Sequence, residues 1–170
     1  MSRISSITVL LAMTIASVPA GARELSLEIE VPRLQVAEYH RPYLAIWVAR
    51  TDNSVAQHLS VLYDLDMENQ EGEKWLKDMR QWWRRGGRKL DMPVDGVSGA
   101  TIGPGVHRLD FSTQVADLAP GEYRLMVEAS REVGGREVLA IPFQWPPRKA
   151  AMPRAAGGAE LGTLVLHLGP

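Results

Sequence analysis

The chain has 170 residues, of which 45% are hydrophobic and 23% are charged, so it is long enough for one domain with a substantial core. Its formal net charge of -1 argues against nucleic acid as the main partner, because neutralising phosphates requires a basic surface. The absence of cysteine excludes disulfides, iron–sulfur clusters and thiolate zinc sites.

The N-terminus has the pattern of an export signal. Arg3 precedes an apolar stretch over residues 7–18, and small residues follow that stretch. The apolar stretch is too short to span a bilayer comfortably, so an export signal is favoured over a retained membrane helix. We therefore predict a cleaved signal peptide over residues 1–22 and a single exported domain over residues 23–170.

Alternating and apolar runs predict that this domain is mainly β. Residues 25–31 alternate apolar with polar side chains, as in a strand with one buried face. Residues 43–48 are apolar on both faces and predict a central strand, which forms a hairpin with the alternating run from Val55. Further strands are predicted over residues 106–111, 123–129, 138–143 and 160–168. Residues 146–158 are rich in Pro, Ala and Gly and predict a flexible loop.

A tryptophan-rich segment interrupts the β pattern. Apolar residues at positions i, i+1, i+4, i+7 and i+8 from Trp75 to Trp83 form one stripe of an α-helix, and two glycines at residues 86–87 end it. The opposite face is basic, and Arg88 and Lys89 follow the end of the helix. The whole pattern predicts an all-β fold, an antiparallel immunoglobulin-like β-sandwich with one inserted Trp-rich α-helix.

The loop over residues 90–104 contains the one stretch that suggests chemistry, which is Asp95-Gly96-Val97-Ser98-Gly99-Ala100-Thr101. It presents two hydroxyls, and Gly99 and Ala100 keep side-chain bulk away from Thr101. An alternative interpretation is a glycine-rich connection in which the Asp and the Ser make local turn hydrogen bonds.

An Asp, two free positions and then Ser-Gly-Ala-Thr resemble the acceptor motif of bacterial proteins that carry FMN through a phosphoester to the threonine hydroxyl. The resemblance implies that Thr101 bears the flavin and that a separate flavin transferase attaches it. The motif departs from its commonest form at Ile102, where a further Thr or Ser often follows the acceptor. The other candidate cofactor-binding residues are Asp95, Ser98, Gly99, Ala100 and Arg88.

Residues near the motif offer further contacts to a flavin. Trp75, Trp82 and Trp83 could stack on an isoalloxazine ring, and Arg88 is close enough in sequence to the motif to meet a phosphate. For Trp75 and Trp82, burial of the helix against the sandwich is the favoured interpretation, because their spacing already explains them.

Other polar residues predict neither an active site nor a metal site. The histidines lie on different predicted elements, and no His lies near Ser98 in a recognisable nucleophile arrangement. Around the glycine pair at residues 134–135 we expect Glu128 to pair with Arg131 and Glu132 to pair with Arg136.

The chain as a whole is similar to a family of predicted bacterial periplasmic proteins known as domain of unknown function 2271. The similarity lies in residues 43–48, 74–83, 95–104, 121–123, 128–132 and 160–162. The resemblance implies a periplasmic location, with PepSY-type membrane proteins and flavin transferases as companions.

These features predict a periplasmic, non-catalytic electron carrier with FMN on Thr101 and a PepSY-type membrane protein as its redox partner. The alternative is a periplasmic interaction module that docks a PepSY-type membrane protein without any flavin. An enzyme is not predicted.

Overall fold

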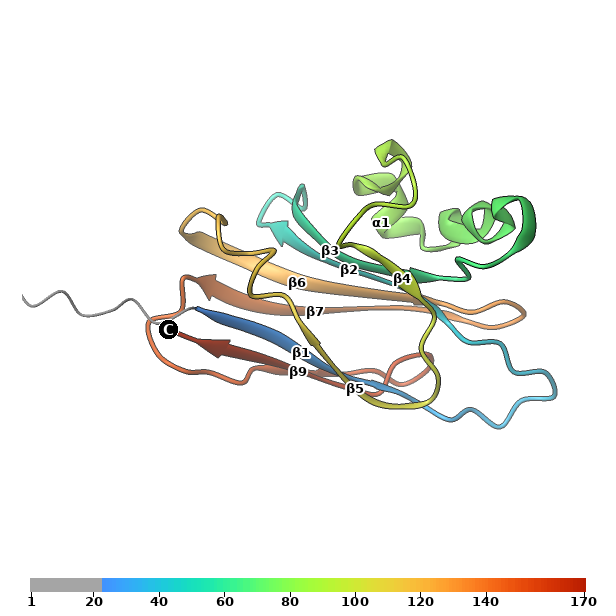
Figure 1. Ribbon diagram of the computed structural model, residues 1–170. Coiled ribbons are helices and arrows are strands. Elements are labelled where there is room, and N and C mark those ends of the chain that lie inside the picture. Colours follow the sequence, from blue (N-terminus) through green and yellow to red (C-terminus); the bar gives the residue numbers. More distant parts are fainter. Residues whose placement is uncertain (1–22) are drawn as a thin grey trace, which may run out of the picture.

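A computed structural model describes residues 23–170, so the predicted signal peptide over residues 1–22 lies outside the described part of the chain. The described residues form a mainly β fold of two sheets with helical turns on one side (Figure 1). The four-stranded sheet has the order β5 (Gly105–Asp110), β1 (Glu24–Val31), β9 (Thr163–Gly169) and β8 (Arg154–Ala156). The five-stranded sheet has the order β4 (Ser98–Ala100), β3 (Val55–Tyr63), β2 (Tyr43–Arg50), β6 (Gly121–Ser130) and β7 (Arg136–Trp145).

The two sheets face each other as a sandwich, and apolar residues from both sheets form the core between them. Neighbouring strands are antiparallel except β3 and β4, which run parallel with Leu62 opposite Gly99. This architecture confirms a mainly β, sandwich-like fold, whereas its immunoglobulin-like type stays a prediction. The expectation of a wholly antiparallel arrangement is wrong at β4, which pairs parallel with β3.

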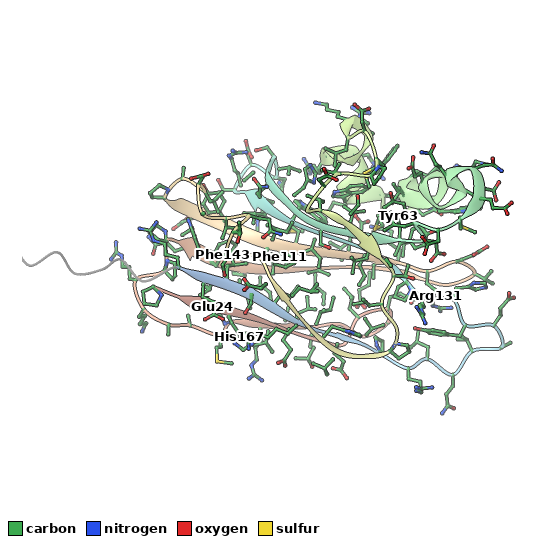
Figure 2. The ribbon with its side chains drawn as sticks, viewed as in Figure 1. Glu24, Tyr63, Phe111, Arg131, Phe143 and His167 are labelled. Atoms are coloured by element: carbon green, nitrogen blue, oxygen red, sulfur yellow. The ribbon has the colours of Figure 1, made fainter. Side chains whose placement is uncertain are left out.

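Strand β2 is buried on both faces because it lies between two apolar layers. Ile46 and its alternate neighbours belong to the core between the sheets. Trp47, which points to the opposite face, belongs to a second apolar cluster beneath the helical turns. Tyr63 of β3 lies in the same second cluster (Figure 2). The prediction of a central strand over residues 43–48 is therefore confirmed.

The helical turns cover the outer face of the five-stranded sheet (Figure 1). They comprise the 3-10 helix η1 (Glu68–Asp78), the α-helix α1 (Arg80–Arg85) and the 3-10 helix η2 (Gly87–Lys89). The prediction of one α-helix from Trp75 to Trp83 is therefore wrong, because the chain kinks at Met79 between two different helical windings. The fully buried carboxylate of Glu128 accepts hydrogen bonds from the amides of Gln81 and Trp82 in the first turn of α1, so a new helix starts there.

The segment predicted as a flexible loop over residues 146–158 is also more regular than expected. It contains β8, which pairs with β9, and Ala151 forms a bridge with Leu168. Short edge pairing of this kind needs only backbone hydrogen bonds, so the composition of the segment did not predict it. No helix among residues 23–170 is long and apolar enough to cross a membrane.

Candidate functional site

A cavity of about 450 Å³ lies at the end of the five-stranded sheet where β2 begins and β3, β4 and β6 end. We call it the Thr101 cavity. It is lined by residues of the β1–β2 loop, the strand ends, η1 and the β6–β7 hairpin, namely Tyr39, His40, Arg41, Tyr43, Asp64, Trp75, Asp78, Thr101, Ser130, Arg131, Glu132 and Val133. Thr101, on which the sequence analysis centred, thus lies at the wall of a cavity.

The acceptor-like motif is more ordered than the predicted loop. Ser98 to Ala100 form the edge strand β4, and the hydroxyl of Ser98 accepts a hydrogen bond from the amide of Val94 at 2.9 Å. At Gly99, an added Cβ would lie 2.8 Å from a methyl group of Leu62, so the glycine permits close packing against β3. Ala100 and Asp95 are exposed. The motif therefore places Thr101 directly after a strand that fixes the direction of the chain.

The carboxylate next to Thr101 is Asp64, not the Asp95 of the motif. The Thr101 hydroxyl donates a hydrogen bond to Oδ1 of Asp64 at 3.2 Å, and the Tyr43 hydroxyl donates to Oδ2 at 3.4 Å. Burial, and then the charge of Asp64, raise the pKa of Tyr43 to about 12. Tyr43 therefore stays protonated at neutral pH and acts as a donor to Asp64.

Asp64 was missed by the sequence analysis because it lies 37 positions before Thr101. It immediately follows the alternating run of β3, and only the parallel pairing of β3 with β4 brings the two side chains together. A pattern read along one segment carries no sign of such a pairing.

Of the residues predicted to contact a flavin, Trp75 lines the Thr101 cavity, whereas Trp82 and Arg88 do not. Trp82 is fully buried, and its indole N–H donates to Nδ1 of His58 at 3.1 Å, so the packing interpretation is confirmed. The packing interpretation is wrong for Trp75, which is 46% exposed and lines the Thr101 cavity. Arg88 is exposed on η2 and does not line the cavity, whereas Arg41 of the β1–β2 loop does.

A buried ion pair supports the cavity at the β6–β7 hairpin, where Figure 2 labels Arg131. Arg131 Nε and Nη2 donate to the two carboxylate oxygens of Glu160 at 2.9 and 3.2 Å, and the amide of Gly135 donates to the same carboxylate at 2.7 Å. Both side chains of the pair are nearly inaccessible, at 6% and 5% exposure. The pair therefore fixes the hairpin to the loop before β9.

The predicted ion pairs around this hairpin are wrong. Glu128 pairs with Arg136 rather than Arg131, with 2.6 Å between Oε1 and Nη1. Glu132 lies 3.6 Å from Nδ1 of His40. Side chains three positions apart along an extended chain, such as Glu128 and Arg131, point to opposite faces of the sheet, whereas Arg136 lies on the neighbouring strand and on the same face as Glu128.

Val133 forms the strained rim of the cavity. Its φ of 52° lies in the left-handed region, which is costly for a β-branched residue, and its side chain is 79% exposed. Backbone strain of this kind is found preferentially at binding and functional sites.

Among residues 23–170, no group of three His, Asp or Glu side chains is arranged to hold a metal ion. Burial lowers the pKa of His58, and Nε2 of His107 lies 2.8 Å from the carbonyl oxygen of Gly103. These histidines have structural surroundings, and neither lines the Thr101 cavity.

Comparison with known proteins identifies one family. Residues 12–163 match the model of a family described as "Predicted periplasmic protein (DUF2271)". No curated protein and no solved structure matches the chain.

Proposed function

Because the chain belongs to the DUF2271 family of predicted periplasmic proteins, we propose that it works in the periplasm as a non-catalytic electron carrier. In this proposal FMN is attached through a phosphoester to Thr101 by a separate flavin transferase, and a PepSY-type membrane protein is the redox partner. The bound FMN supplies electron transfer at its isoalloxazine ring. We also propose that the sandwich is of the immunoglobulin-like type, because it consists of two facing sheets.

The observation that carries the proposal is the position of the Thr101 hydroxyl. It is partly exposed, it follows a short ordered strand, and it lies at the wall of a cavity of about 450 Å³. An acceptor hydroxyl has to be reachable by another enzyme, and a hydroxyl in the sandwich core would not be.

Asp64 supplies the local chemistry that an acceptor hydroxyl needs. Its carboxylate accepts the Thr101 hydrogen bond at 3.2 Å, so the hydroxyl proton points toward a group that can act as a base. In the proposed attachment, Thr101 Oγ1 would displace AMP from the riboflavin-side phosphorus of FAD, and Asp64 is the group placed to accept the hydroxyl proton.

The test is co-expression of the full chain with an active flavin transferase, followed by intact mass and visible absorbance. The wild type is expected to gain the mass of one FMN less water and to become yellow, whereas Thr101→Ala gains neither. Thr51→Ala is the matched control, because Thr51 is an exposed threonine in the β2–β3 turn, and it is expected to behave like the wild type. An unmodified wild type, or a flavin that survives in Thr101→Ala, refutes the proposal.

A second candidate function is an interaction module that docks a PepSY-type membrane protein without flavin. It is favoured by Trp75 and Val133, two exposed apolar side chains that line the same cavity. Binding of the partner by the unmodified chain, together with no mass gain, would establish this function in place of the first.

A further inference from the structure

We infer that the Thr101 cavity is the docking site for the isoalloxazine ring of the attached FMN, and that the indole of Trp75 is the aromatic face against which the ring stacks. The inference rests on the proposed function, because the ring reaches the cavity through a tether on Thr101. It adds where the ring lies and which residue holds it.

The cavity has the size and position that a tethered ring requires. Its volume of about 450 Å³ falls within the range of pockets that bind small organic molecules, about 300–1,000 Å³. The acceptor residue is itself part of the wall. A flavin on Thr101 therefore needs only to fold its ribityl chain back onto the protein, and covalent tethering removes most of the entropic cost of binding the ring.

Trp75 reaches this cavity because of the local helical winding. It lies in η1, a 3-10 helix, where residues three apart lie on the same side. Trp75 and Asp78 have this spacing, and both line the cavity. On one continuous α-helix Trp75 would have shared the buried stripe of Leu76 and Trp82, which are 1% and 0% exposed.

The exposure of Trp75 is the main evidence for a ring-shaped ligand. Trp75 is 46% exposed, so much of its large apolar surface is in contact with water. The next residue, Leu76, is buried in the second apolar cluster. Flat aromatic ligands cover such a surface by offset stacking.

A charged group for the flavin phosphate is present at the same place. Arg41 is an exposed residue of the β1–β2 loop and lines the cavity, whereas the sequence-based candidate Arg88 does not. A guanidinium pairs well with a phosphodiester oxygen. The cavity thus places an aromatic face and a cation around one acceptor hydroxyl, together with the carboxylates of Asp64, Asp78 and Glu132.

The test uses the flavinylated full chain, after its mass gain has been confirmed. Time-resolved anisotropy and intensity of the flavin fluorescence are compared for the wild type, Trp75→Phe, Trp75→Ala and the matched control Trp83→Phe. Trp83 is a partly buried tryptophan of α1 outside the cavity wall. Trp75 is half exposed, so its substitution leaves the fold intact, which far-ultraviolet circular dichroism verifies.

In the wild type and in Trp83→Phe, the flavin is expected to be strongly quenched and to depolarise only with the tumbling of the whole protein. Trp75→Ala is expected to be several-fold brighter and to gain a fast depolarisation component, and Trp75→Phe is expected to keep the slow component while losing part of the quenching. A flavinylated wild type with fast depolarisation, or a Trp75→Ala variant identical to it, overturns the inference and leaves the proposed function intact. Failure of the mass gain overturns both.

Discussion

Replacing the buried carboxylate of Glu128 is expected to destabilise the contact between α1 and the five-stranded sheet. Glu128 lies on β6 and is 0% exposed. Its Oε2 accepts from the amide of Trp82 at 2.7 Å, and its Oε1 accepts from the amide of Gln81 at 3.0 Å and from Arg136 Nη1 at 2.6 Å. One carboxylate therefore satisfies two helix amides and a guanidinium at the same time.

The magnitude follows from counting the bonds that Glu128→Gln loses. The amide group of glutamine has the shape of the carboxylate, but its NH2 is a donor and cannot accept a hydrogen bond. On one side of the group, this NH2 therefore faces another donor. The amide can keep its oxygen toward Gln81 and Arg136, so the hydrogen bond lost is the one from the Trp82 amide, which costs about 1.5–3 kcal/mol. Arg136 is 39% exposed, so water compensates its charge when the carboxylate is removed.

Urea denaturation followed by tryptophan fluorescence measures this loss. With a slope of about 2 kcal/mol/M, the midpoint is expected to fall by about 1 M. Glu122→Gln is the matched control, because Glu122 is an exposed glutamate on the same strand, and its change is expected to stay within about 0.5 kcal/mol. A midpoint for Glu128→Gln that equals that of the control would refute the reasoning.

Three further predictions concern the cavity and the loops around it. The phenol of Tyr43 is expected to titrate with a pKa of about 12 instead of 10.0, so the stability that its neutral form contributes is complete below pH 10 and is lost as pH rises through 12. Ultraviolet titration checks this, and Asp64→Asn should bring the pKa closer to 10.0; an unperturbed wild-type titration contradicts it. Burial tends to raise the pKa of Glu137, but four backbone amides of the loop before β9 donate to its carboxylate and lower the pKa overall. Glu137→Gln should therefore cost about 2 kcal/mol at neutral pH, and the difference in urea midpoint should shrink as acid protonates the folded wild type; a difference that persists in acid argues against this role. Gly72→Ala should cost about 2 kcal/mol or more in thermal unfolding, because the new Cβ would overlap the backbone carbonyl of Asp64. Gly158→Ala, whose Cβ meets nothing within 4 Å, is the control, and equal losses in the two variants would show that the overlap is relieved without cost.

Several strands could be predicted from the sequence because each is encoded by a local pattern. β1 alternates as a strand with one buried face does, and β2 is apolar on both faces because it has an apolar layer on each side. These patterns depend on residues one or two positions apart, so a single segment contains the whole signal.

The helical segment shows where a local pattern is insufficient. The apolar spacing from Trp75 to Trp83 fits one α-helix. In the structure the same residues belong to the end of a 3-10 helix, a break at Met79 and a short α-helix. The choice between them depends on the carboxylate of Glu128, which comes from another strand. For that reason the environments of Trp75 and Trp82 differ although their spacing suggests one stripe.

The amino-acid sequence by itself determined the β-rich class, the family and the motif that ends at Thr101, because periodicity and motif identity are properties of neighbouring residues. Only the tertiary structure decided what surrounds Thr101. Asp64, Trp75, Arg41 and the β6–β7 hairpin reach it through strand pairing and helix winding, and contacts between residues so far apart leave no periodic trace in the chain.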